Sequence, residues 1–319
     1  MPGYSKAEHQ RMRAGGLPER QRIARLVRSC ALVSADEAEF VRRARRSGLS
    51  VRPRYGKHGQ EVVGYSVALR GREADGPDGQ KTAAKQVWFG GGRLAADLSL
   101  PRLRGYWPAP TAQSSAKALA QWSRGADVAG PKEAPEQVVY EGAVWRQAVA
   151  RVEDVTAQLG QGAPQDAALW SSAARYAAAL MAGLSARLEG ESPGPITATA
   201  GLLARAAQTP AHPDRRLVRR GGLADLRGVA MVIRHAPASP EMKLLLPAVV
   251  ALAHAIGLWQ QAERPRLAAE LAGVRTAYPP PSAREIAANL RSVGAPGPPM
   301  GPPGTDPAAR ARRFQGRGR

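Results

Sequence analysis

The sequence holds a single cysteine, Cys30, and few aromatic residues, which make up 5% of its 319 positions. One cysteine excludes an internal disulfide framework and a zinc site built from several cysteine ligands. Cys30 lies in an apolar stretch, so we expect a buried, unreactive thiol in a reducing, cytoplasmic compartment. The first residues also lack the apolar run of a signal peptide, and we expect none.

Long hydrophobic runs are scarce as well. The longest extends from Leu244 to Trp259 and is interrupted by Pro247 and His254. A membrane-spanning helix needs about 20 apolar residues, so this run is shorter than a span. It predicts a buried helix, and we expect no insertion into a membrane.

Motifs that carry chemistry are missing too. The five histidines are far apart in the sequence and form no H-x-H or H-E-x-x-H pair: His9, His58, His212, His235 and His254. There is no phosphate-binding G-x-x-x-x-G-K-[ST] loop and no G-x-S-x-G nucleophile elbow. We therefore predict no catalytic residue, no metal and no cofactor. A hidden metal-dependent nuclease, with a site built from distant residues, is kept as an alternative.

Positive charge is abundant. The chain has 46 Lys and Arg, of which 39 are Arg, against 26 Asp and Glu, and its net charge is +20. Such a balance favours a polyanionic partner. The Ala, Gly and Pro content is typical of a GC-rich genome, which enriches arginine everywhere, so local clusters carry more information. Residues 1–57 contain 14 basic against 5 acidic residues, a net +9.

The pattern of elements predicts an α+β fold, in which a small module of two helices and three strands precedes a mainly helical bundle. A helix ends near residue 33, and Ser34 with Glu37 predicts a capping box for the next one, which Gly48 would end. Alternation predicts strands over 49–55 and 61–69, joined by a hairpin loop at 56–59. In chain order, the sequence then predicts a third strand at 87–89, a glycine turn at 90–92 and a short helix at 94–98. Pro53 favours an edge strand.

The chain divides into four predicted parts: a basic module at 1–108, a linker with a short helix at 109–133, a helical domain at 134–294 and a disordered basic tail at 295–319. Helical periodicity predicts helices over 111–123, 136–159, 165–189, 195–208, 240–260, 262–277 and 282–293. The stretch 214–238 gives no clear pattern. The tail is rich in Pro, Gly and Arg and has too few apolar residues to order itself.

The best functional signal is a surface for nucleic acid, because basic side chains bind phosphates irrespective of base sequence. The predicted phosphate-binding residues are Arg42, Arg43, Arg45, Arg46, Arg52, Arg54, Lys57, Arg93, Arg102 and Arg104. Tyr55 and Trp88 are candidates for stacking on bases. Tyr65 and Trp88 fit equally well as aromatic residues of the core.

The module also resembles a known family. The likeness is carried by Ala35–Val41, Val51–Tyr55, Val63–Val67, Trp88–Arg104 and Trp107, and by a second patch of Trp170, Ala173-Ala174, Leu188–Gly190, Pro193–Pro195 and Leu203–Arg205. These residues, a little under half of the chain, are similar to the region that follows the nuclease domain in actinobacterial relaxases. Relaxases are mobilisation proteins of conjugative plasmids and integrative elements.

Relaxases of this kind nick DNA at a transfer origin with a tyrosine and a histidine-bound metal. No such tyrosine and histidine cluster precedes Ser34, so no catalytic residue is carried over. The resemblance implies the DNA-handling and partner-docking half of a relaxase. Its partners would be single-stranded or origin-of-transfer DNA and a nuclease-bearing relaxase or a transfer-machinery protein.

Two other functions fit the sequence. A winged-helix-like regulator would place the 34–47 helix in the major groove and Lys57 at the tip of its wing. A helical protein-interaction scaffold would owe its charge to codon usage alone.

Overall fold

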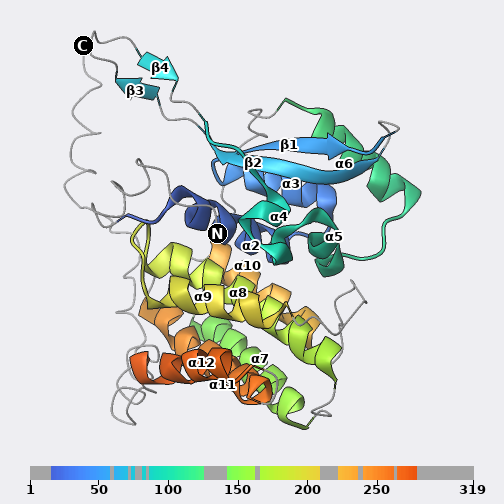
Figure 1. Cartoon of the computed structure of the whole chain (residues 1–319). Helices are drawn as coiled ribbons and strands as arrows, with labels where there is room; N and C mark the ends of the chain where they lie inside the picture. Colours follow the sequence, from blue (N-terminus) through green and yellow to red (C-terminus); the bar gives the residue numbers. More distant parts are fainter. Residues whose placement is uncertain are drawn as a thin grey trace, which may run out of the picture. The chain divides into compact units, whose positions relative to one another are not determined.

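The computed structural model describes residues 16–57, 61–70, 73–75, 81–83, 86–125, 142–161, 166–208, 222–235, 240–261 and 264–278. Within them it is mainly helical, with a small antiparallel sheet that follows two N-terminal helices (Figure 1). Several predictions lie outside the described residues: the tip of the hairpin loop, the helix at 282–293 and the tail at 295–319.

The two N-terminal helices are α2 (Glu19–Val33) and α3 (Glu37–Arg46). The N-cap of α3 lies two residues after the predicted one. Asp36 is the N-cap and accepts from the Glu39 amide, while the Glu39 carboxylate accepts from the Ala35 amide. Ser34 instead donates its hydroxyl proton to the carbonyl of Cys30, which closes α2. The predicted Ser34–Glu37 box is therefore wrong.

Gly48 ends α3 with φ of 82°, the left-handed conformation that favours glycine, as predicted. The chain then enters β1 (Leu49–Tyr55), which pairs antiparallel with β2 (Val62–Leu69), and β2 pairs with β5 (Phe89–Gly90). In the order β1-β2-β5, β1 is an edge strand, as Pro53 predicted. The third strand begins two residues later than expected. A separate two-stranded ribbon consists of β3 (Glu73–Asp75) and β4 (Lys81–Ala83).

Short turns follow the sheet, in the order α4 (Gly91–Leu94), η1 (Ala96–Leu98), α5 (Leu100–Leu103) and η2 (Arg104–Tyr106), before α6 (Ala112–Ser123). They lie between the sheet and α2 (Figure 1). A Cβ at Gly91 would come within 2.5 Å of the Tyr65 ring and of the Leu98 carbonyl oxygen, so only glycine fits there. The glycine run thus serves a tight, closely packed turn.

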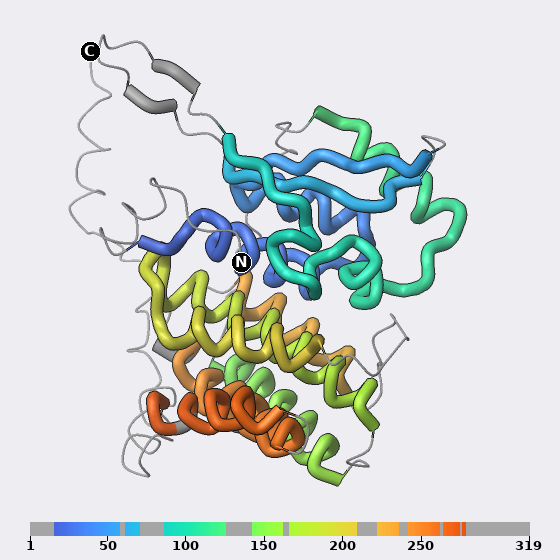
Figure 2. The backbone as a smooth tube through the Cα atoms, in the orientation of Figure 1, coloured from blue at the N-terminus to red at the C-terminus, as the bar shows by residue number. Residues whose placement is uncertain are grey.

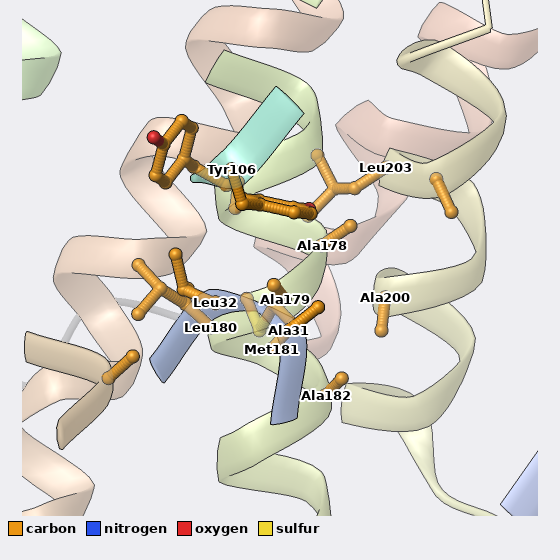
Figure 3. Close-up of a cluster of buried hydrophobic side chains, with 14 of the residues drawn as sticks. Ala31, Leu32, Tyr106, Ala178, Ala179, Leu180, Met181, Ala182, Ala200 and Leu203 are labelled. Carbon is orange, nitrogen blue, oxygen red and sulfur yellow. The ribbon is translucent and has the colours of Figure 1, made fainter. Parts of the chain in front are cut away.

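The remaining helices are α7 (Gly142–Gln161), α8 (Ala167–Leu188), α9 (Pro195–Ala206), η3 (Leu223–Asp225) with α10 (Leu226–His235), η4 (Pro240–Leu244) with α11 (Leu245–Gln260), and α12 (Pro265–Ala277). They confirm the predicted helices between 136 and 277, and α10 fills part of the stretch that gave no clear pattern. Helix α8 is central, with 16 of its 22 residues buried. Small side chains let α9 and α2 pack closely on it, as around Ala178, Ala182 and Ala200 in Figure 3.

Helix α2 connects the sheet module to the helical region (Figure 2). Its Arg25 donates to the Ser185 hydroxyl and the Gly190 carbonyl at the end of α8. On its other side, the Ala31 carbonyl accepts from the indole of Trp107. The hydrophobic core accordingly runs without interruption from the sheet to α12.

Among the described residues, Met242–Gln260 is apolar and long enough to cross a membrane, with a mean hydropathy of 1.7. Half of this stretch is buried within the fold, where α11 contacts α7, α8 and α12. The absence of membrane insertion stays a prediction.

Candidate nucleic-acid interface

The outer face of the sheet is the surface of the sheet opposite α3, and it carries Arg52 and Arg54 of β1. In the register of the sheet, Arg52 lies opposite Ser66 and Arg54 lies opposite Gly64 of β2. Both β2 residues are small, so they project little above this face of the sheet. The Arg52 guanidinium lies 3.8 Å from the centroid of the Trp88 ring. Because Trp88 precedes β5, which borders β2 on its far side, the Arg52–Trp88 pair spans the middle strand.

Gly64 allows Arg54 to lie along the sheet. A Cβ at this glycine would come within 3.0 Å of the Arg54 Nε atom. The Val63–Val67 part of the family likeness therefore has a local reason: glycine makes room for a flat arginine, and Tyr65 beside it is a core residue. The Tyr65 hydroxyl donates to the Leu98 carbonyl at 2.8 Å, and burial raises its pKa far above the usual range.

The outer face is positively charged. Arg52, Arg54 and Lys57 are exposed, and none of them forms an ion pair within the described part of the chain. Tyr55 is 40% exposed at the same end of β1. Arg93 is also exposed and borders the β5 edge, where a Cβ on Gly90 would be 3.9 Å from its Cγ atom.

The arginines of α3 do not form the solvated basic surface that the sequence predicted. Arg45 is only 2% exposed and donates to the Gln121 and Arg124 carbonyls at the C-terminal end of α6. Arg43 pairs with Glu39 and contacts the ring of His235. Arg42 and Arg46 are half-buried. No residue of α3 is exposed, because the sheet, α2 and α6 all pack against this helix.

Arg104 is also a structural residue. Its guanidinium holds Glu37 with two hydrogen bonds of 2.7 and 3.1 Å and donates to the Val62 carbonyl at 2.8 Å. The indole of Trp122 donates to the same Glu37 carboxylate. Glu37 thus joins α3, η2 and α6, and Arg104 is not free to bind phosphate. Arg102, on α5, is half-buried.

A buried ion pair lies beneath the turns, and no sequence motif identified it. Arg28 of α2 holds Asp97 of η1 with hydrogen bonds of 2.7 and 3.0 Å. Burial by itself would lower the pKa of Arg28, but the charge and the hydrogen bonds of Asp97, together with Tyr106 and Tyr65, outweigh burial and raise the pKa. The Asp97 residue lies within the Trp88–Arg104 stretch of the likeness, so this stretch has a structural role.

The second patch of the likeness is structural as well. The Glu189 carboxylate accepts from the amides of Ile196 and Thr197 at the start of α9. Gly194 has no room for a side chain because Glu189 lies against its Cα. Glu189 therefore caps α9, since a carboxylate is favoured at a helix N-terminus.

The described part of the chain contains no group of three or more His, Cys, Asp or Glu side chains that could hold a metal ion. Of the five histidines, His9, His58 and His212 lie outside the described residues. Compared with known proteins, the chain matches no protein-family model, no curated protein and no solved structure.

Proposed function

We propose that this chain binds nucleic acid through the outer face of its sheet and favours single strands. The observation that carries this proposal is the Arg52 guanidinium over the Trp88 ring, beside Arg54, which forms no ion pair within the described part of the chain. Guanidinium planes stack on unpaired bases, and an indole on one side leaves the other side for a base. Arg54 and Lys57 would then bind the phosphates that flank it.

A single strand suits this surface better than a duplex. Unpaired bases stack on flat, exposed side chains, and a basic groove follows the backbone. A winged-helix regulator instead needs a helix that enters the major groove. Helix α3, the element with that position in the chain, has no exposed residue, which is an argument against this alternative.

We place this activity in DNA mobilisation, as an accessory chain or the C-terminal part of a relaxase that works in the cytoplasm without a nuclease site of its own. The support is the resemblance of both patches, together with the open basic face. The helical region would dock to a nuclease-bearing relaxase or to the transfer machinery.

The test is fluorescence anisotropy of the full chain with a labelled single strand and the matching duplex across a salt series. We expect tighter binding to the single strand and a steep fall in affinity with salt, because bound cations are released from phosphates. No binding at low salt would overturn the proposal. Protection of one particular duplex sequence would favour the regulator instead.

A matched pair of variants tests the placement. The triple variant Arg52→Glu, Arg54→Glu and Lys57→Glu should lower affinity at least about tenfold. The control reverses three exposed basic residues of the helical region, Arg146, Lys243 and Arg266, and changes net charge equally. We expect a change of about threefold or less in the control. Equal losses in both would show that total charge, and not the sheet, determines binding.

A further inference from the structure

A second basic feature lies away from the sheet. A cleft of about 780 Å³ lies between α2 and α9 and extends to α4 and α12. Four arginines line it: Arg20, Arg25 and Arg28 of α2, and Arg205 of α9. The single carboxylate in its lining is that of Glu270. The cleft is therefore cationic, although two of the arginines are paired with acids.

The walls between the arginines are small or apolar. They include Ala24, Ala182, Ala198, Ala200 and Gly201. These side chains leave room for a ligand and give it an apolar surface to lie on. The cleft thus combines charged donors with space for a flat, uncharged group.

In each of these arginines, some of the N–H donors bind acceptors of the protein and so fix the position of the guanidinium group. Arg20 donates to the Leu94 carbonyl at 3.1 Å, and Arg205 donates to Glu270 at 2.7 Å. Arg28 is held by the ion pair to Asp97. An arginine side chain has five N–H donors in a rigid plane, so these contacts orient the groups and leave further donors.

Arg25 adds a buried positive charge to the lining. It is 5% exposed, and its Nε atom has no hydrogen-bond partner among the described residues. Burial lowers its pKa, an effect that the charge of Glu189 partly opposes. This Nε atom is sealed from solvent, so Arg25 contributes its positive charge to the cleft and not an open donor.

We propose that this cleft binds a phosphate-bearing ligand of nucleotide size. Phosphate oxygens accept paired hydrogen bonds from guanidinium groups, and the small residues of α8 and α9 would contact the base or sugar. Glu189 already accepts from the first amides of α9, so the arginine side chains, and not the helix terminus, hold the phosphate. This site is separate from the sheet interface and does not depend on it.

Gly201 provides the test. It lines the cleft within α9, and a Cβ added there would meet no atom within 4 Å. Gly201→Leu should therefore fold and fill the cleft, while the control Gly201→Ala adds only a methyl group. We expect pyrophosphate and ATP to raise the melting temperature of the full-length wild type and of Gly201→Ala. Calorimetry should show at least tenfold weaker binding to Gly201→Leu.

A charge change should act in the opposite direction. Glu270→Gln releases Arg205, and both side chains are about half exposed, so folding should be unaffected. We expect it to bind pyrophosphate a few times more tightly than the wild type. The proposal is overturned if neither ligand binds at millimolar concentration, or if Gly201→Leu binds as well as Gly201→Ala.

The source of the phosphate is distinguished by a labelled oligonucleotide. If Gly201→Leu weakens both the oligonucleotide and pyrophosphate, the phosphate is that of a DNA backbone. If it weakens only pyrophosphate and ATP, the ligand is a free nucleotide. The triple variant of the sheet should keep its affinity for pyrophosphate, so the failure of one proposal can be told from the failure of the other.

Discussion

The arginines of α3 and those of β1 are alike in sequence and different in the folded protein. Arg45 of α3 lies in the interior and binds the carbonyls that end α6, whereas Arg52 and Arg54 of β1 lie on an open face. Helix α3 is covered by the sheet, α2 and α6. On the outer face of the edge strand, Gln86 covers Ser50 and Trp88 lies against Arg52, while Arg52 and Arg54 remain exposed. A basic sequence therefore predicts how many guanidinium groups the protein has, and the packing of the fold determines what each of them binds.

Several of these guanidinium groups bind backbone carbonyl oxygens. Arg20, Arg70 and Arg264 donate to backbone carbonyls, as Arg45 does. The last turns of helices leave carbonyls without partners, and a long side chain with several donors can reach them. The net charge of +20 consequently overstates the charge available for a ligand.

The largest effect should come from Asp97→Ala, which leaves Arg28 as an uncompensated buried charge. Breaking such a pair costs about 3–5 kcal/mol of the free energy of unfolding. Urea denaturation followed by circular dichroism measures it, with Asp154→Ala on the exposed side of α7 as the control. A loss below about 1 kcal/mol would contradict the structural role of this arginine.

Arg45→Met tests the buried member of the comparison directly. It removes charged hydrogen bonds to two carbonyls, so we expect a loss of about 2–4 kcal/mol in the free energy of unfolding. The affinity of the folded protein for a single strand should not change. Arg42→Met, in the same helix but half-buried, should be milder in urea denaturation; equal losses would remove the distinction between the two.

Arg52→Lys tests the exposed member. Lysine keeps the charge and loses the flat group that lies on Trp88, so stacking on a base is lost. We expect about fivefold weaker binding to a single strand, or ~1 kcal/mol. Arg54→Lys is the matched control and should change the anisotropy titration by less than about twofold, since a point charge suffices for phosphate. Equal effects would contradict stacking.

The smallest effect concerns pH. Burial would raise the pKa of Glu39, but the hydrogen bond from the Ala35 amide and the contacts with Arg43 lower it below its ordinary 4.5. A pKa lowered in the folded state gives stability that is present above the unfolded-state pKa and is lost as pH falls through the folded-state pKa. The advantage of the wild type over Glu39→Gln, about 1 kcal/mol or less at pH 7, should therefore shrink below about pH 4.5. Urea titrations from pH 7 to 3 measure it; a constant difference would contradict the shift.

Local patterns predicted the elements of this fold well. Gly48, Pro53 and the helical periodicity each act through neighbours within a few residues, and the structure confirms them. The N-cap was misplaced because Ser34-x-x-Glu37 and Asp36-x-x-Glu39 have the same spacing. Their order depends on where α2 ends, and the sequence around residue 34 does not determine that.

The sequence by itself determined the three strands of the main sheet, most of the helices, the edge position of β1 and the excess of arginine, because periodicity, capping and composition are local properties. Only the tertiary structure decided which arginines are free. Arg45 meets its acceptors 76 and 79 residues away, and Arg28 meets Asp97 69 residues away. The cleft between α2 and α9 likewise exists only because segments distant in the chain are packed together. A guanidinium group donates to whatever acceptor the fold brings near it, and a local sequence pattern does not show which acceptor that is.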